Sequence, residues 1–200
     1  MNDFNLLRVT PFDAQSLPNQ SSQLYDTYIG LWIDGLDEIE KREIVNSLFQ
    51  YIQHKDGYKL KILTKSRDNL TENLIDEVAH LNDLYHQTVP FEEDLVSAIS
   101  KLRVVVDLTL EPKLFLQICC IGAGIPQINK KRTDYVKHMH NGYIIDDISQ
   151  TVESLDYFLA HLKNWNYSYA YSMRLSDDFS SINIIHQINQ LFKGDVSSGT

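Results

Sequence analysis

The sequence predicts an α/β fold, a Rossmann-like doubly wound sheet of six parallel strands. The continuous apolar run YIGLWI and the valine-rich run LRVVVDL are typical of central strands in a parallel sheet. Amphipathic segments of helical period separate such runs, as the crossovers of a parallel sheet require. With 200 residues, 43% of them hydrophobic, the chain is long enough to build one sizeable core.

The strands are predicted where apolar or β-branched residues lie between turn signals. Residues 28–33 form the first strand, and residues 59–64 (KLKILT) form the second, directly after the Asp56-Gly57 turn. Residues 102–108 are the clearest strand because they contain three consecutive valines. The remaining strands are expected at residues 84–89, 125–128 and 143–145.

The helices are predicted from apolar residues at helical spacing. Expected helices cover residues 36–52, 69–81, 91–100, 151–162 and 180–192, and a further helix is opened by Glu111-Pro112, since proline is tolerated in a first turn. An aromatic segment, residues 164–171 (NWNYSYAY), is expected to join the last two helices. Its rings either pack into the core or form a platform on which the CH faces of sugars stack.

These elements indicate one Rossmann-like domain at residues 25–193. Residues 1–24, with Pro11, Pro18 and a polar NQSSQ run, are expected to be a linker or a segment that packs on a missing upstream domain. Residues 194–200 (GDVSSGT) are expected to form a disordered tail.

Composition excludes several classes of partner and compartment. The net charge of -9 argues against a nucleic-acid partner, because neutralising phosphates needs clustered lysine and arginine. No apolar run reaches the roughly 20 residues that cross a bilayer, and the N-terminal MNDFNLLRVT lacks a signal-peptide pattern. A cytoplasmic protein is therefore expected.

Neither the cysteines nor the histidines predict a metal site. Cys119 and Cys120 are adjacent in an apolar helix, a spacing that fits neither a disulfide framework nor a zinc site, so two buried core thiols are expected. His138 and His140 would point to different sides of a helix. We therefore expect no metal and no cofactor.

Ligand chemistry, where present, is expected at the carboxyl ends of the strands, where open α/β sheets bind ligands. Gly122, Gly124 and Gly142 are predicted to lie at such ends, where glycine permits a positive φ and a close approach of the backbone to a phosphate or sugar. The alternative is that these glycines simply end helices.

Residues 118–146, ICCIGAGIPQINKKRTDYVKHMHNGYIID, suggest what that ligand would be. An apolar helix, Gly-Ala-Gly, a short strand, a polar loop, a second helical turn and Asn-Gly ahead of another strand follow in that order. The segments GAGIPQI, TDYV, HNG and YIID resemble the second Rossmann-like domain of the GT-B glycosyltransferases. The resemblance implies a nucleotide-sugar groove or glycan-binding site at Glu111, Cys119, Gly122, Gly124, Ile125, Pro126, Thr133, Asn141 and Gly142.

The chain departs from the GT-B pattern at two donor contacts. Retaining members have two glutamates eight residues apart, and here Glu111 matches the first while Cys119 stands at the second position. A thiol cannot offer the ribose hydroxyls a charged acceptor. The Gly-Arg pair that holds the diphosphate is replaced by Asp34-Gly35, whose carboxylate would repel it, although Lys41 matches a later lysine of the pattern. The resemblance thus implies a degenerate donor groove.

A second resemblance covers nearly the whole chain, on RVTPFDAQSLPNQ, YIGLWIDGL, VVVDLTLEPKLFLQICCIGAGIPQIN, TDYVKHMHNGYIID and NWNYSYAYSMRLSDDFSS. These segments are similar to the C-terminal part of the first accessory secretory protein of the accessory Sec system, which exports serine-rich glycoprotein adhesins in Gram-positive bacteria. It implies a GT-B-like protein without transferase activity. The implied partners are two sister accessory proteins, an accessory SecA-type motor ATPase and the adhesin or its glycans, and the complex could bring the protein to the inner face of the membrane. An active glycosyltransferase with unusual donor contacts is the alternative.

Overall fold

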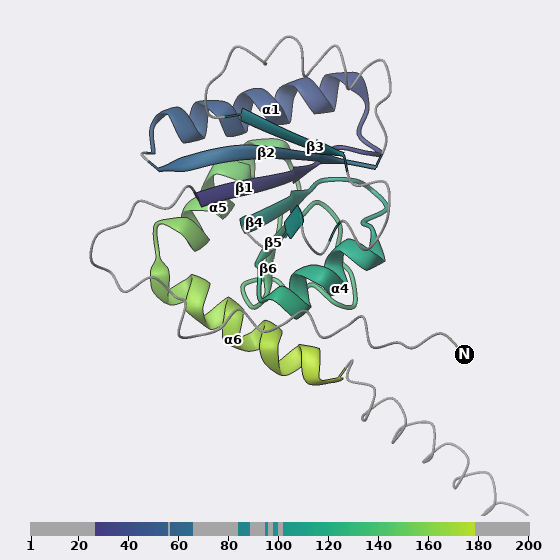
Figure 1. Cartoon of the computed structure of the whole chain (residues 1–200), viewed down its shortest axis with the longest axis vertical. Helices are drawn as coiled ribbons and strands as arrows, with labels where there is room; N and C mark the ends of the chain where they lie inside the picture. Colours follow the sequence, from purple (N-terminus) through teal and green to yellow (C-terminus); the bar gives the residue numbers. More distant parts are fainter. Residues whose placement is uncertain are drawn as a thin grey trace, which may run out of the picture.

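Six parallel strands form one sheet at the centre of the molecule (Figure 1). The computed structural model describes residues 27–55, 57–65, 84–88, 95, 98–99 and 102–178. The strand order is β3-β2-β1-β4-β5-β6, the order of the Rossmann fold. The predicted α/β class and parallel sheet are therefore confirmed.

The strands lie within two residues of their predicted bounds. They are β1 (Thr27–Trp32), β2 (Tyr58–Thr64), β3 (Leu84–Thr88), β4 (Leu102–Asp107), β5 (Gln127–Asn129) and β6 (Gly142–Ile144). The order reverses at β1 and β4, which pair with each other at the centre, so the loops that follow these two strands flank the topological switch point.

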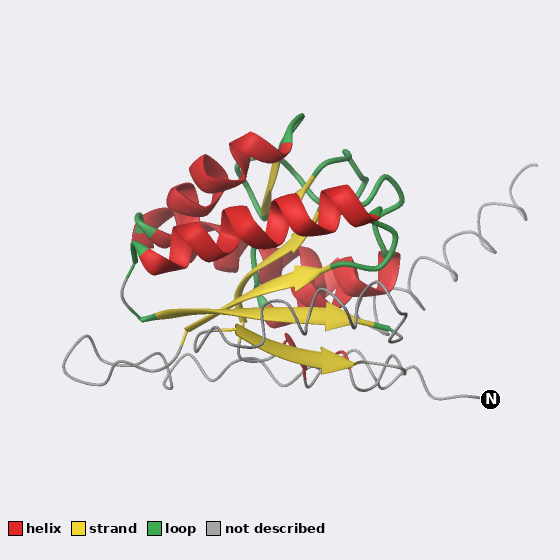
Figure 2. Cartoon of the chain, turned by 90° about the horizontal axis from the view of Figure 1, so that it is seen from above, coloured by secondary structure: helices red, strands yellow, loops and turns green. Residues whose placement is uncertain are grey.

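The helices lie on both faces of this sheet (Figure 2). They are α1 (Glu38–Gln53), α4 (Leu114–Ala123), a short 3-10 turn (Ile148–Gln150), α5 (Thr151–Leu159) and α6 (Leu162–Asp178). The predicted helices at 36–52, after Glu111-Pro112 and at 151–162 are confirmed. The predictions for residues 1–24, 69–81, 180–192 and 194–200 lie outside the described residues, as does most of the predicted helix at 91–100.

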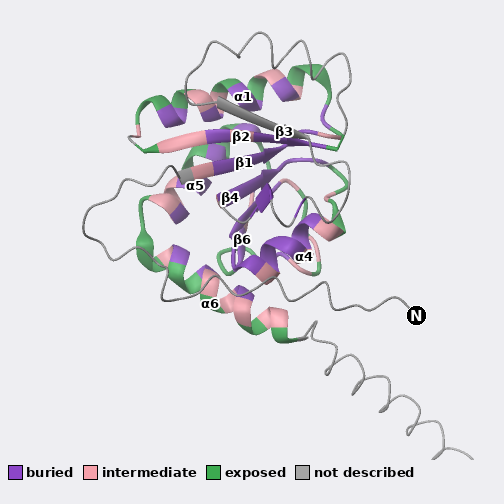
Figure 3. Ribbon diagram, viewed as in Figure 1, coloured by how far each residue is buried: buried purple, intermediate pink, exposed green. Residues whose placement is uncertain are grey.

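Alternate side chains of the strands build two cores, one on each face. Ile29 and Leu31 of β1 pack with α1 and α5, whereas Trp32 packs with α4 on the opposite face. Val105 of β4 belongs to the α4 side, between two valines that belong to the other. Figure 3 shows the consequence: the central strands β1 and β4 are mostly buried, while the outer sides of α1 and α6 are exposed. Within the described residues, no helix has the length and apolar character to cross a membrane.

The aromatic segment at 164–171 was predicted as a connection between two helices, and this prediction is wrong. The segment lies inside α6, because Trp165 anchors that helix to the sheet. The Trp165 indole donates to the main-chain oxygen of Arg103 at 2.9 Å, while the Arg103 guanidinium lies 3.7 Å from the indole centroid and Tyr169 stacks on the ring. Tertiary packing thus outweighs the weak helix propensity of the aromatic residues.

The second helical turn predicted between β5 and β6 is also absent. Residues 130–141 form a loop whose turns are tied by the buried Asn141 side chain. Its Oδ1 accepts from the Lys137 backbone N–H at 2.8 Å, and its Nδ2 donates to the Tyr135 carbonyl at 2.9 Å. An asparagine that satisfies local backbone groups in this way competes with helix formation.

Helices α1 and α5 are joined by one polar cluster. The Tyr51 hydroxyl donates to the Asp156 carboxylate at 2.9 Å, and Lys55 pairs with the same carboxylate at 3.1 Å. Burial, followed by the hydrogen bond to Asp156, raises the pKa of Tyr51 well above its ordinary value, so the phenol stays a neutral donor.

Gly124→Ala should destabilise the protein by about 2–4 kcal/mol in urea unfolding. Gly124 has φ +70°, and a Cβ there would lie 2.2 Å from the Tyr169 ring, so the substitution combines backbone strain with a clash. Gly57→Ala, at an exposed glycine with φ 87°, is the matched control and should cost about 1 kcal/mol. Equal costs at the two positions would contradict the proposed clash with Tyr169.

Candidate functional site

The carboxyl edge of the sheet is where ligands bind in this fold, so the candidate site is built from the loops that follow the strands. The strands end there at Trp32, Thr64, Thr88, Asp107, Asn129 and Ile144. Around the switch point, acidic side chains of the chain itself hold backbone N–H groups at three places.

The turn between β1 and α1 is held by Asp34. The Thr64 hydroxyl donates to its Oδ1 at 2.5 Å, and the Lys65 backbone N–H donates to its Oδ2. The carboxylate therefore ties this turn to the end of the neighbouring strand β2. Gly35 follows with φ +96°, a conformation that L side chains rarely adopt. The acid that replaces the expected cation is thus part of the turn's own structure.

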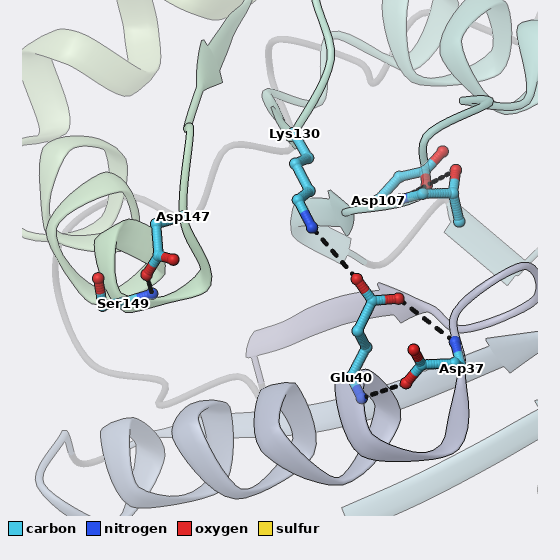
Figure 4. A network of polar contacts seen from close by, with 7 residues as sticks. Asp37, Glu40, Asp107, Lys130, Asp147 and Ser149 are labelled. Carbon is cyan, nitrogen blue, oxygen red and sulfur yellow. Dashed lines mark hydrogen bonds and ion pairs between the residues drawn. The ribbon is translucent and has the colours of Figure 1, made fainter.

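The N-terminus of α1 carries a reciprocal capping box. The Glu40 N–H donates to the Asp37 carboxylate at 2.8 Å, and the Asp37 N–H donates to the Glu40 carboxylate at 3.3 Å. The other oxygen of Glu40 pairs with the ammonium of Lys130 at 3.1 Å (Figure 4). The positive end of the helix dipole is thus already opposed by two carboxylates.

Asp107, the last residue of β4, holds the loop that leads to α4. Its Oδ1 accepts from the Thr109 hydroxyl at 2.6 Å and from the Thr109 N–H at 3.1 Å, and its Oδ2 accepts from the Lys113 N–H at 3.4 Å. Burial raises the pKa of Asp107 above its ordinary value, against the hydrogen bonds from Thr109, which lower it. Beside it, the buried Asn129 donates to the Asp107 main-chain oxygen at 3.4 Å, and its own Oδ1 has no hydrogen-bond partner among the described residues.

Lys130 lies where the loops after β5 and β6 approach α1. In Figure 4 it extends between Asp147 and Glu40. The hydrogen bonds from Ser149 lower the pKa of Asp147 most, and the charge of Lys130 lowers it further. The positive charge of Lys130 therefore already faces carboxylates of the chain, where a phosphate would otherwise use it.

The predicted site residues do not come together in the structure. Glu111 is exposed in the loop after β4, at the carboxyl edge, and Cys119 is buried in the middle of α4. Thr133 lies in the loop after β5, where its hydroxyl accepts from the Val136 N–H at 3.0 Å. The other residues lie at the amino edge of the sheet, in the last turn of α4 or where β5 and β6 begin: Gly122, Gly124, Ile125, Pro126, Asn141 and Gly142.

The prediction that the glycines lie at the carboxyl ends of strands is therefore wrong. Helix α4 starts at the carboxyl edge and crosses back before β5 begins, so its end belongs to the opposite edge. Gly124 ends α4 in the left-handed conformation, and the Ile125 N–H donates to the Cys120 carbonyl at 2.8 Å. A Cβ on Gly142 would lie 2.6 Å from the Gln127 carbonyl oxygen, so this glycine permits close packing of two strands. A binding role for these residues stays a prediction.

Sequence reasoning missed the groups that occupy the carboxyl edge. Asp107 and Asn129 are polar residues that directly follow apolar strand residues, a pattern that could have marked them. The ion pair between Glu40 and Lys130 joins residues far apart in the chain, so no local sequence pattern predicts it.

Comparison with protein families gives one family for most of the chain. Residues 60–195 match the family model of accessory Sec system protein 1. The curated protein of that description from Staphylococcus aureus (strain NCTC 8325 / PS 47) is 37% identical over 95% of this chain and 41% of its own length. That from Streptococcus gordonii is 33% identical over 86% of this chain and 32% of its own length. The chain therefore spans less than half of these relatives.

Solved structures agree on the fold. A chain of the glycosylation-associated protein (Gap123) complex from Streptococcus agalactiae matches with a TM-score of 0.75 and 26% identity, over 83% of this chain and 36% of that chain. A chain of the complex of accessory secretory proteins 1, 2 and 3 from Streptococcus pneumoniae matches with a TM-score of 0.72 and 24% identity, over 84% and 34%. The pneumococcal O-GlcNAc transferase GtfA matches with a TM-score of 0.64 and 16% identity, over 86% and 38%, which shows the glycosyltransferase-like fold alone.

Asp107→Asn should make stability less dependent on pH. In an unfolded chain Asp has a pKa of about 3.9, and burial raises the pKa of folded Asp107 above this value. As pH rises through the interval between the two values, the unfolded chain loses its proton first, so the free energy of unfolding of the wild type falls. The Asn variant lacks this loss. Urea unfolding at steps from pH 3.5 to 7 should show that the free energy of unfolding of the wild type falls relative to that of the variant as pH rises. The opposite trend would contradict the raised pKa of Asp107.

Proposed function

The chain belongs to the family of accessory Sec system protein 1, and we propose that it is a non-catalytic, glycosyltransferase-like part of the accessory Sec export machinery. The observation that carries the proposal is the occupied carboxyl edge. In a nucleotide-sugar site, backbone N–H groups at this edge and at helix N-termini bind the diphosphate. Here Asp34, Asp37 and Asp107 already accept from such N–H groups.

Electrostatics supports the same conclusion. A diphosphate placed at the N-terminus of α1 would meet the carboxylates of Asp34, Asp37 and Glu40, which lie within seven residues of chain. Like charges a few ångströms apart repel in a partly desolvated site, and expelling a carboxylate would leave its N–H donor unpaired. Lys130 gives little compensation because its ammonium pairs with Glu40. The donor would therefore have to break the contacts that hold the edge together.

The helix that follows gives a second support. Cys119, at the place of the second donor glutamate, is 1% exposed within α4, so no polar group reaches the ribose from that position. Of the two glutamates of the retaining pattern, only the exposed Glu111 is present. The alternative of an active glycosyltransferase rests on Glu111, Gly122 and Gly124, and the two glycines lie at the opposite edge of the sheet.

Exposed apolar side chains suggest that protein covers this edge instead. Ile39 in the first turn of α1 is 75% exposed, Leu110 after β4 is 65% exposed, and Leu114 at the start of α4 is 50% exposed. Apolar side chains gathered at one edge favour a protein contact over a phosphate ligand. We accordingly propose that this edge takes part in assembly with the two sister accessory proteins.

The wider role follows from the family. The proposed assembly works in the cytoplasm, reaches the inner face of the membrane through its partners, and hands a serine-rich glycoprotein adhesin to an accessory SecA-type motor. The similarity to a chain of the complex of accessory secretory proteins 1, 2 and 3 supports the sister proteins as partners. The motor and the adhesin are inferred from the family resemblance.

The chain should show no transfer from nucleotide sugars, because the donor contacts are absent. Incubation of the complex with UDP-N-acetylglucosamine and a serine-rich acceptor peptide, followed by mass spectrometry, should leave the peptide unmodified. Glu111→Gln should leave adhesin export unchanged, since an exposed residue that binds no donor has no catalytic task. Transfer that Glu111→Gln abolishes would overturn the non-catalytic assignment.

Replacing Leu110 and Leu114 by serine should weaken capture of the sister proteins by about tenfold, as expected when a contact surface loses its apolar centre. Leu162→Ser is the matched control, since Leu162 is 45% exposed but starts α6 at the other edge of the sheet. Affinity capture with purified sister proteins measures the binding of the double variant and of the control variant. Equal capture by the wild type and the double variant would show that the proteins meet elsewhere.

A further inference from the structure

Arg103 is a half-buried arginine at the amino edge of the sheet, on the face that α5 and α6 cover. The pairing of β4 with β1 runs from Leu102 directly to Val104, so Arg103 is an extra residue in β4. Leu102 accordingly belongs to the core beside α4, whereas Val104 belongs to the core beside α1 and α5. An extra residue of this kind redirects its own side chain, and such irregularities are common next to binding sites.

The indole ring of Trp165 holds the guanidinium group in one place. The guanidinium carbon lies 3.7 Å from the ring centroid, and the indole N–H donates to the main-chain oxygen of the same arginine at 2.9 Å. Trp165 is itself buried and stacks on Tyr169. A guanidinium group that rests on a fixed aromatic ring loses little conformational freedom when it binds a ligand.

No carboxylate of the described residues neutralises Arg103. Its side chain has five N–H donors, and none of them meets a hydrogen-bond acceptor in the described part of the chain. Burial lowers the pKa of Arg103, and the nearby Tyr58 phenol is the one described group that acts in the opposite direction. Charges that are partly buried are normally paired, so this guanidinium group marks a place where an anion would be stabilised.

The hydroxyl of Tyr58 gives the same place a second donor. Its hydrogen bond to the Leu159 carbonyl is 3.5 Å long, which is at the limit for such a bond. Burial raises the pKa of Tyr58, against the positive charges of Arg103 and Lys55, so the phenol is neutral and can donate to an anion.

The charges that act on Tyr58 leave one positive charge without a partner among the described groups. Lys55 pairs with Asp156 at 3.1 Å, and the same carboxylate accepts from the Tyr51 hydroxyl. These two charges cancel, and the charge of Arg103 is left. One carboxylate would balance it, whereas a phosphate group carries about 1.5 to 2 negative charges at neutral pH.

We propose that Arg103 and Tyr58 form a carboxylate-binding site, and that its ligand is an acidic side chain of a protein segment that crosses the amino edge. The guanidinium fork binds a carboxylate through two parallel N–H···O bonds, and the phenol donates a third. Tryptophan, tyrosine and arginine, the three residue types of this site, are also those that contribute most to binding at protein interfaces. The inference goes beyond the proposed function, because it concerns the edge of the sheet opposite to the one assigned to the sister proteins.

The two tryptophans of the chain make the test specific, because Trp165 supports the site and Trp32 belongs to the other core. The full chain, labelled with ¹⁵N, is titrated at constant ionic strength with the peptides acetyl-ALELA-amide and acetyl-ALQLA-amide. The glutamate peptide should shift the indole signal of Trp165 and leave that of Trp32 in place, with a dissociation constant of roughly 1 mM. The glutamine peptide should leave both signals in place.

Four variants assign the binding to these side chains. Arg103→Met keeps an apolar stem on Trp165 and should abolish the shift, whereas Arg103→Lys keeps the charge without the fork and should weaken binding by about fivefold. Tyr58→Phe removes one donor and should weaken binding by about threefold. Arg132→Met, in the exposed loop after β5, is the matched control and should bind like the wild type. An unchanged Trp32 signal in each variant shows that the fold is retained.

Three results would overturn the proposal. The first is no shift of the Trp165 signal at about 20 mM glutamate peptide, well above the expected dissociation constant. The second is equal binding of the peptide by Arg103→Met, which would place the site elsewhere. The third is binding of sodium acetate as tight as that of the glutamate peptide, or tighter binding of inorganic phosphate, since either would indicate a site for a free anion. Acetate should bind at least about threefold more weakly, because it has no apolar neighbours to pack beside the carboxylate.

Discussion

The loops at the carboxyl edge of the sheet are held in place because carboxylates of the same chain accept hydrogen bonds from their backbone N–H groups. Asp34 joins the turn after β1 to the end of β2, Asp37 caps α1, and Asp107 holds the loop that leads to α4. Each carboxylate satisfies donors that the parallel sheet necessarily exposes where a strand passes into a helix. The same contacts order the loops and occupy backbone N–H groups that an anionic ligand would need, so the order of these loops and the proposed loss of the donor site would have a common cause.

The central strands could be predicted well because largely apolar runs in the sequence indicate buried strands. Residues 28–33 carry no charged residue and residues 102–108 carry only Arg103 and Asp107, and the structure buries the central residues of both runs completely. Helix α6 could not be predicted in the same way. Its aromatic residues have a weak preference for helix, and what makes them helical is the distant contact of Trp165 with Arg103.

The candidate site was predicted by residue type but not by place. Glycine, proline and asparagine correctly marked the points where chain direction changes, yet the same residues serve helix ends and strand starts at either edge of a sheet. Which edge they occupy follows from the direction of α4, which crosses the sheet between β4 and β5. Aromatic contacts such as those of His140 with Tyr167 and Tyr171 likewise join separate stretches of sequence, so residue spacing could not predict them.

Helix α4 has a composition that matters before the protein is folded. Its ten residues, LFLQICCIGA, include no charged side chain, and no side chain caps its N-terminus. An isolated helix of this length is unstable in water, so α4 forms only when the sheet and α6 are there to receive it. During synthesis the segment is an exposed apolar stretch that a chaperone can hold and that a neighbouring chain can capture.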